Sequence, residues 1–330
     1  MTVASSHLIA PSARRTPRAF SLPVLLVGVA IVALELFVGG SVGEYYLLLA
    51  YVILQYLVVA TGWNILGGYA GYVNFGTAAF FAVGCYTTIA LQKLANVPLP
   101  ISILAAGVVA GLLGLATGYL TLRLRGVFFS IATLALAVVL QTLIINWSFV
   151  GGARGTYVLR PDPIAPFTTY VQYLLVLMTV LAVASVLIAI AVERSWIGMG
   201  LAAIRDDELA AEASGVPGLR LKLIATTLCG ALMGMAGAPF PYFITYVEPA
   251  SAFSLAIAVN AIAMPLIGGT ATWWGPVVGT VLLGTTQQVL TVTISSAANL
   301  LIVGILLVVF VTAAPTGVVG LVRGMRGGRR

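Results

Sequence analysis

The sequence predicts an all-α integral membrane protein, a polytopic bundle of about ten transmembrane helices. Of its 330 residues 61% are hydrophobic and only 8% are charged, and the mean hydropathy is +1.10. A soluble domain carries roughly a quarter charged residues, and so little charge cannot cover a water-facing particle of this size. Most of the exterior is therefore expected to face lipid.

Apolar runs follow one another along the chain, each bounded by charge or by Gly and Pro. A helix needs ~20 residues to cross about 30 Å of hydrocarbon. The predicted spans are 20–39, 45–62, 65–91, 101–122, 127–147, 170–192, 223–244, 253–268, 276–294 and 299–319. They form one transmembrane domain, 20–319, between polar tails at 1–19 and 320–330. The first run is interpreted as an uncleaved helix because it is long for a signal peptide.

The cations divide unequally between the two faces of this arrangement. With the N-terminus inside, only Lys93, Arg154 and Arg160 fall outside, and the other cations of the predicted loops and tails are cytoplasmic. This split follows the positive-inside rule, so both termini are predicted to be cytoplasmic. The net charge of +7 is therefore a topology signal, and no nucleic-acid partner is expected.

The sequence lacks the residue patterns that metal binding and nucleotide binding require. The single histidine, His7, lies in the polar N-terminal tail, and Cys85 and Cys229 stand far apart in apolar runs, so no metal site is predicted. A phosphate-binding loop needs a Gly-Lys-Ser or Gly-Lys-Thr ending, whereas Lys93 and Lys222 are both followed by leucine. No cofactor is expected on this chain, and neither is a catalytic residue.

An ion-coupled carrier is the alternative that these exclusions leave open. Such carriers place carboxylates near the middle of the membrane. Within the predicted spans only Glu35 qualifies, and it lies near the outer end of its span. The alternative predicts that Glu35→Gln abolishes uptake.

The loop 193–222 is the largest segment outside the predicted spans. Alanine and leucine favour a short helix from Leu201 to Ala213, and Gly215 and Pro217 are typical of a helix stop. The acidic run Asp206, Asp207 and Glu208 rules out a membrane span there. The segment is either a solvated surface helix or a helix that docks a soluble partner.

Four ordered blocks resemble the permease subunits of ABC importers for branched-chain amino acids, of the leucine, isoleucine and valine type. The most specific block is RSWIGMGLAAIRDDELAAEASG, at 194–215. The others are GWNILGGYAG at 62–71 leading into AAFF at 78–81, GVFFSIATLA at 126–135, and IGG at 267–269 followed by WGP at 274–276. The resemblance runs from about residue 63 to 276.

The resemblance implies a division of labour among subunits in a bacterial-type plasma membrane. Two related permeases would form the pathway, two ATPases would bind ATP and Mg²⁺, and an extracytoplasmic binding protein would deliver substrate. The loop 193–222 would hold a cytoplasmic coupling helix seated on an ATPase. Leu201, Ile204 and Leu209 would supply apolar contacts, Arg205, Asp206, Asp207, Glu208 and Glu212 would supply charge complementarity, and Gly198 and Gly215 would permit tight turns.

Two Gly-rich blocks, 67–76 and 268–279, interrupt apolar runs in different halves of the chain. Transporters often bind substrate at interrupted helices. The candidate pathway residues are Asn64, Gly71, Asn74, Thr77, Gly269, Thr270, Thr272 and Trp274. The alternative is close helix packing through small residues, for which Gly76, Gly84, Gly279 and Gly284 are candidates.

The chain departs from the family pattern where substrate is concerned. Thr77 stands where the pattern commonly has histidine, and the outer stretch at 150–155 reads VGGARG. Branched-chain or other small amino acids are the expected substrates, with urea, short amides or small carboxylates as alternatives.

Overall fold

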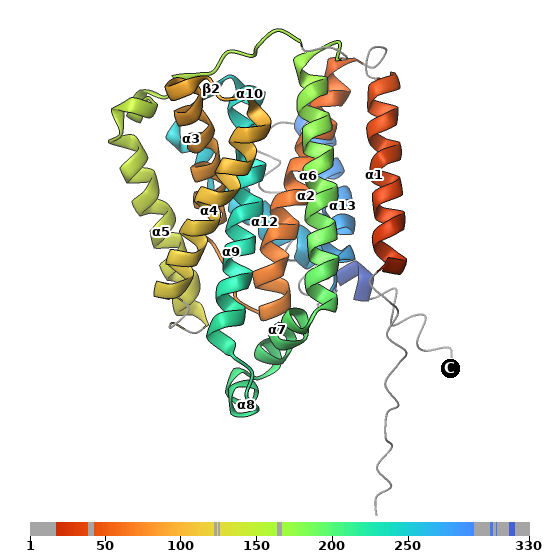
Figure 1. Ribbon diagram of the computed structural model, residues 1–330, viewed down its shortest axis with the longest axis vertical. Coiled ribbons are helices and arrows are strands. Elements are labelled where there is room, and N and C mark those ends of the chain that lie inside the picture. The colour runs from red at the N-terminus through yellow and green to blue at the C-terminus, as the bar shows by residue number, and fades with distance from the viewer. Residues whose placement is uncertain are drawn as a thin grey trace, which may run out of the picture.

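The computed structural model describes residues 18–38, 43–121, 124, 126–163, 167–293, 304–305, 308 and 317–320. Long helices run side by side, roughly along the longest axis of the molecule (Figure 1). They are α1 (Arg18–Val38), α2 (Glu44–Ala70), α3 (Thr77–Ala95), α4 (Leu99–Thr121), α5 (Val127–Ile145), α6 (Tyr170–Arg194) and α9 (Gly218–Gly237). Two further helices, α12 (Leu255–Gly268) and α13 (Trp274–Thr293), are inclined to them.

The prediction of a helical, polytopic membrane bundle is confirmed, although its count of ten is not. Among the described residues, seven helical stretches are long and apolar enough to cross a membrane. Helix α1 has 21 residues, and the part of it that the structure describes fully, Leu22–Leu36, is apolar. The predicted span 299–319 and both predicted tails lie largely outside the described residues.

The predicted boundary between the second and third spans is wrong. The sequence pattern placed it near Gly62, but α2 continues without a break to Ala70. Gly71, at φ 76°, ends the helix in the left-handed region that glycine adopts at little cost. Residues 72–75 have no helical structure, and α3 starts only at Thr77.

The helical chain is also interrupted between α9 and α12, near the other end of the bundle. After α9 the chain forms α10 (Phe240–Ile244), the two-residue strand β2 (Tyr246–Val247) and α11 (Pro249–Ala252). β2 pairs antiparallel with β1 (Thr156–Tyr157), and the short helices η1 (Ser148–Val150) and η2 (Gly152–Arg154) precede β1. The span predicted to begin at residue 253 therefore holds a helix, α12, of only 14 residues.

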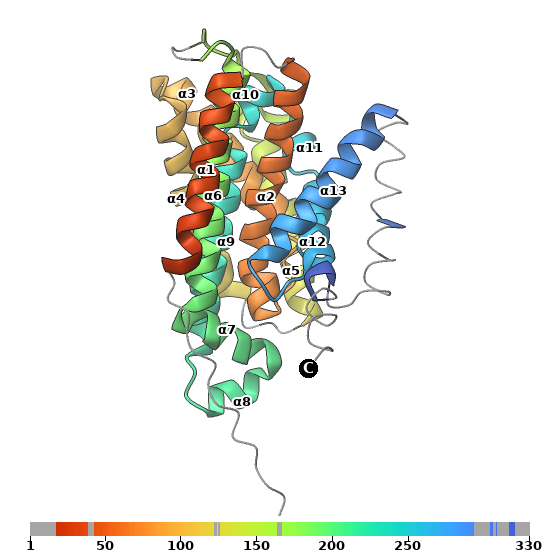
Figure 2. The same ribbon diagram turned by 90° about the vertical axis from the view of Figure 1, so that its right-hand side faces the viewer.

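The helix α9 occupies the centre of the bundle, packed between α3, α4 and α2 (Figure 1). Small residues bring the backbones together. Gly234 of α9 packs against Gly84 of α3, and it also packs against Ala106 and Ala110 of α4. Seen from the side, α13 crosses α12, and α1 stands in front of α6 (Figure 2). The predicted close packing at Gly84 and Gly279 is present, whereas Gly284 has only ordinary contacts.

The described cations separate along the bundle as the sequence predicted. Arg160 donates to the carbonyl oxygens of Tyr242 and Phe243, and Lys93 donates to that of Phe149, which places both at the end that carries β1 and β2. Arg194 and Arg205 lie at the opposite end, where α6 passes into two short helices. Which membrane face each end meets stays a prediction.

Candidate functional site

The segment 193–222 projects from one end of the bundle as two short helices, α7 (Trp196–Asp206) and α8 (Glu208–Ala213), in Figure 1. The sequence predicted a single helix from Leu201 to Ala213, which is wrong in two ways. Helix α7 starts at Trp196, five residues before the predicted start, and Ser195 caps it because its Oγ accepts from the N–H groups of Ile197 and Gly198. Asp207 is extended and caps α8 by accepting from the Ala210 N–H, so it separates the two helices.

The two predicted turn glycines have different roles. Gly215 has φ 86° and follows α8, in agreement with the prediction of a tight turn. Gly198 lies inside α7, where a Cβ would press against the carbonyl oxygens of Val192 and Glu193. Its role is therefore a close approach of α7 to the end of α6, and the turn itself is made at Ser195.

The predicted partner-facing residues divide into an inward and an outward set. Leu201 and Ile204 are buried by the chain itself, whereas Leu209 is 64% exposed. Asp206, Asp207 and Glu212 are also exposed. Trp196 and Met199, which the sequence interpretation did not single out, add exposed apolar surface on α7. The exposed surface of α7 and α8 is therefore mixed, apolar and acidic.

Glu208 faces inward and forms a buried ion pair. Its Oε1 lies 2.8 Å from Lys222 Nζ, and only 4% of the Lys222 side chain is exposed. The Tyr72 hydroxyl donates to Glu208 Oε2 at 2.7 Å, and Lys222 Nζ donates to the same hydroxyl at 3.2 Å. This Tyr72–Glu208–Lys222 cluster joins the break after α2, the start of α8 and the start of α9.

Two further polar contacts connect the same segment to the Gly-rich blocks. Arg205 Nη1 donates to the carbonyl oxygen of Gly68 at 3.2 Å, and its stem packs on Gly71, where a Cβ would be 3.0 Å from Arg205 Cγ. Glu193 Oε2 accepts from the Tyr69 hydroxyl at 3.2 Å and from the Trp273 N–H at 2.6 Å. The segment therefore holds both interrupted regions through side chains.

The structure brings the two Gly-rich blocks together. Asn64 Nδ2 donates to the carbonyl oxygen of Thr272 at 3.2 Å. The backbone of Thr270 lies so close to Gly68 that a Cβ at this position would collide with the Thr270 carbonyl oxygen. Gly269 ends α12 at φ 121°, and the exposed Trp274 ring stacks on Trp273 with centroids 4.1 Å apart. The stacked tryptophans lie beside Glu193, whose carboxylate accepts from the Trp273 N–H.

Asn74 and Thr77 mainly bond the break to which they belong. Asn74 Oδ1 accepts from the Gly76 N–H at 2.7 Å, and the Thr77 hydroxyl donates to the Asn74 carbonyl at 3.2 Å. Trp63 Nε1 donates to the same carbonyl. These bonds satisfy the irregular backbone of the break, as the packing interpretation expects. A role for Asn74 or Thr77 in lining a pathway stays a prediction.

Comparison with known proteins agrees with this architecture. Residues 45–311 match the family model described as branched-chain amino acid transport system, permease component. The chain belongs to this permease family. Two LivM proteins, described as high-affinity branched-chain amino acid transport system permease proteins, are each 25% identical to it; the match covers 81% of this chain and 68% of the relative in both Salmonella typhimurium and Escherichia coli.

A probable branched-chain amino acid permease, LivH of Methanocaldococcus jannaschii, is also 25% identical over 75% of this chain and 83% of its own length. No solved structure gives a significant match. Membership of the permease family makes the chain a membrane transport component.

The sequence interpretation missed Glu193, Tyr72 and Lys222 as functional candidates. Lys222 had a signal: it is a lone lysine at the start of an apolar run, and such a residue needs a partner when the helix is buried. Glu193 and Tyr72 had none, because their partners are more than 75 residues away in the sequence.

Proposed function

We propose that this chain is the permease subunit of an ABC importer and forms half of a pathway for branched-chain or other small amino acids. A second homologous permease would form the other half, and an extracytoplasmic protein would deliver the substrate. Two ATPases, which would bind ATP and Mg²⁺ themselves, would dock at the end of the bundle that carries α7 and α8. The family assignment and the names of the relatives support this proposal.

The observation that carries the coupling role is the two-sided character of the segment 193–222. Its outer side exposes Leu209, Trp196 and Met199 next to acidic groups, a surface suited to docking a soluble subunit. Its inner side holds the two Gly-rich blocks through Arg205, Glu208 and Glu193. Movement imposed on the segment by an ATPase would therefore be passed directly to both blocks.

A pull-down in mild detergent, followed by mass spectrometry, tests the proposal. Two ATPases with a phosphate-binding loop and a second permease are the expected co-purifying subunits. A chain that is recovered alone even after crosslinking would contradict it.

Replacing the exposed leucine of α8 should separate the chain from its ATPases. We expect Leu209→Asp to reduce ATPase co-purification and uptake at least about tenfold, because central apolar anchors dominate interface energies. The matched control is Leu159→Asp, since Leu159 is 79% exposed and lies beside β1 at the opposite end. Equal co-purification in the two variants would remove α8 from the interface.

The outer carboxylate is expected to be dispensable for transport. Glu35 Oε1 accepts from the Thr179 hydroxyl at 2.7 Å, and Glu35 O accepts from Gln172 Nε2, so the residue joins α1 to α6. Gln at this position keeps an acceptor for Thr179. We expect Glu35→Gln to retain ATP-dependent uptake within about twofold, because such an exchange of a structural hydrogen bond costs ~1 kcal/mol or less. Loss of uptake in this variant, measured in proteoliposomes, would instead favour a carrier driven by an ion gradient.

A further inference from the structure

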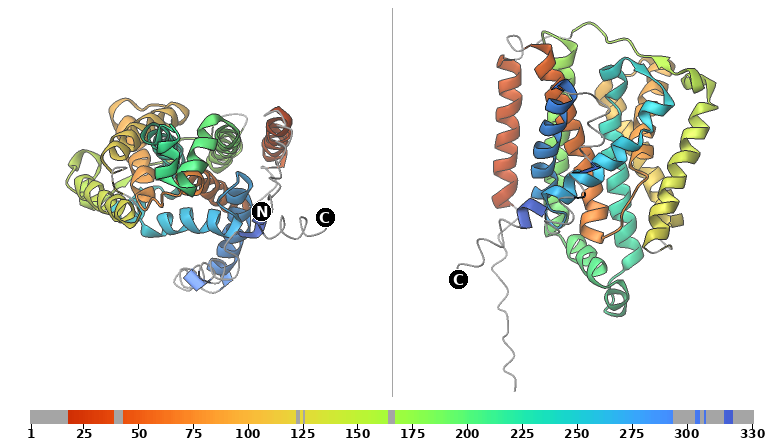
Figure 3. Two further views of the ribbon diagram at one scale, coloured as in Figure 1. Left: turned by 90° about the horizontal axis from the view of Figure 1, so that it is seen from below. Right: turned by 180° about the vertical axis from the view of Figure 1, so that it is seen from behind.

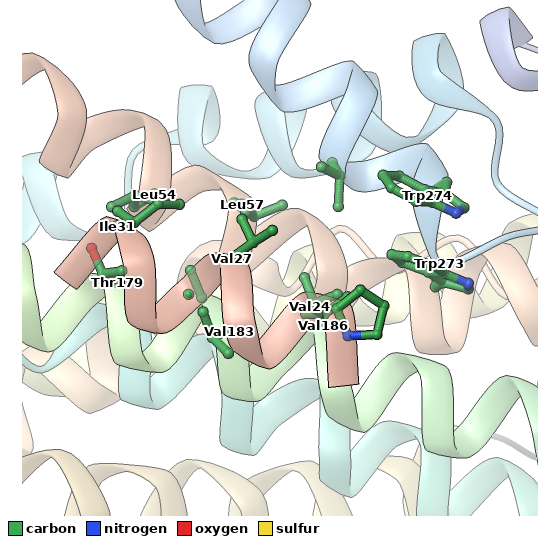
Figure 4. Close-up of a pocket in the computed structure, with 14 residues that line it drawn as sticks. Val24, Val27, Ile31, Leu54, Leu57, Thr179, Val183, Val186, Trp273 and Trp274 are labelled. Carbon is green, nitrogen blue, oxygen red and sulfur yellow. The ribbon is translucent and has the colours of Figure 1, made fainter. Parts of the chain in front are cut away.

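Two cavities inside the bundle differ in the solutes that they suit. The larger, about 260 Å³, lies between α1, α2, α6 and the start of α13 (Figure 4). Valine, isoleucine and leucine side chains line it, with Trp273 and Trp274 at one end (Figure 4). Its one hydroxyl, on Thr179, already donates to Glu35, and apart from the indole N–H groups of the two tryptophans its lining is apolar.

The smaller cavity, about 200 Å³, lies between α2, α3 and the interrupted stretch from α10 to α12. Its lining includes the polar side chains of Gln55, Ser251 and Ser254, the ring of Tyr56, and the apolar side chains of Phe81, Phe240 and Ile257. A largely apolar cavity with a few polar groups is the general form of a small-molecule site.

The irregular stretch places a helix start within the membrane. Helix α12 has 14 residues, so it is ~21 Å long, and it runs obliquely through the bundle (Figure 3). Its C-terminal end lies next to the contact between Trp273 and Glu193. Its N-terminal end therefore falls inside a hydrocarbon layer of about 30 Å, where irregular backbone is tolerated only if it borders protein or a cavity.

The cavity presents a positive and a negative partner to a ligand. The first N–H groups of α12 carry partial positive charge, and Ser254 caps them by accepting from the Ala256 N–H, which leaves its own hydroxyl proton without an acceptor in the described chain. Gln55, which lines the cavity from α2, is 6% exposed, and its Nε2 donates to Tyr51 Oη and Ala236 O. Its Oε1 has no partner among the described residues and remains as an acceptor.

From this geometry we infer that the Gln55 cavity binds a zwitterionic α-amino acid with an apolar side chain. The carboxylate lies at the start of α12 and accepts from the Ser254 hydroxyl. The ammonium group donates to Gln55 Oε1, and the side chain packs on Phe81 and Phe240, whose rings form a T-shaped pair. The inference rests on the proposed transport function, and it places the intramembrane substrate site here rather than at Asn74 and Thr77.

A cysteine placed in the wall of the cavity tests the inference on the purified full chain. Ala256 lines the cavity and is partly exposed, and Ala256→Cys adds little volume. The native thiols of Cys85 and Cys229 are fully buried, so a small ammonium methanethiosulfonate should label only the new cysteine. The control is Ala153→Cys, in the exposed η2 turn at the end that carries β1.

L-Leucine at ten times its dissociation constant should slow labelling of Ala256→Cys roughly tenfold, in proportion to occupancy, and leave Ala153→Cys unchanged. Leucinamide and 4-methylpentanoate, which each lack one charge, should protect at least fivefold less. Adding Gln55→Leu should abolish protection, whereas Gln172→Leu, a buried glutamine on α6, should preserve it.

Three results would overturn the inference: no labelling of Ala256→Cys without leucine, labelling that leucine does not slow, or protection by urea or acetamide but not by leucine. Failure of the proposed importer function would give results different from failure of the cavity inference. ATPases that do not co-purify with a chain that leucine still protects would leave the cavity assignment intact. Normal ATP-dependent uptake without protection would remove the cavity and leave the importer.

Discussion

Lys222→Met is expected to lower the free energy of unfolding by about 3–5 kcal/mol, because it removes the Lys222 ammonium from a buried ion pair with Glu208. The Glu208 side chain is 16% exposed and the Lys222 side chain 4%, so water compensates little for the lost partner. The Tyr72 hydroxyl still donates to Glu208, but one neutral hydrogen bond does not replace the ion pair. Denaturant unfolding of the purified chain in detergent measures the change.

The double variant Glu208→Gln with Lys222→Met separates folding from coupling. It removes both charges and keeps an oxygen to accept from Tyr72, so most of the lost stability should return. Uptake should nevertheless fall about tenfold, because the ion pair that joins α8 to the start of α9 is lost and the Tyr72 hydroxyl donates to a neutral amide in place of a carboxylate.

A double variant as unstable as Lys222→Met would show that the ion pair is not the source of the effect. Lys93→Met is the matched control. In the part of the chain that the structure describes, the exposed Lys93 donates to the carbonyl oxygen of Phe149, so its loss should change stability by less than about 0.5 kcal/mol.

The fold class followed from the sequence because lipid imposes a strong rule on composition: each crossing needs a long apolar helix. The ends of α4 and α5 and the start of α6 lie within two residues of the predicted limits. The prediction failed where glycine alone was used to locate a break. Gly62 stays helical because Leu232 and Cys229 pack closely against it, which no local pattern reveals.

The candidate site could be predicted less completely from the sequence, because the direction in which a side chain faces depends on tertiary packing. The acidic run at 206–208 and its neighbours were identified, yet Glu208 faces Lys222 while Asp206 faces outward. A single extended residue, Asp207 at φ −157°, separates α7 from α8 and changes the direction of the chain between them. The Gln55 cavity had no sequence signal, since a lone glutamine in an apolar helix is as consistent with packing as with binding.

Gly84→Ala and Gly284→Ala should change stability in opposite directions, although both replace a glycine inside an apolar helix. Alanine is favoured over glycine in a helix by about 0.5–1 kcal/mol. At Gly284 the nearest atom to a new Cβ is Ile53 Cγ1, at 3.5 Å, an ordinary contact. Gly284→Ala should therefore keep the full gain in the free energy of unfolding.

At Gly84 a new Cβ would meet the backbone of Gly234 on α9 closer than real atoms approach. Helix α9 has no room to move away, because Gly234 also abuts Ala106 and Ala110 of α4 on another side. Either α3 or the α4–α9 pair must shift, and we expect a net loss of about 1–3 kcal/mol, as for overpacked cores. Equal stabilisation of both variants, measured by denaturant unfolding in detergent, would contradict the tight contact of α3 with α9.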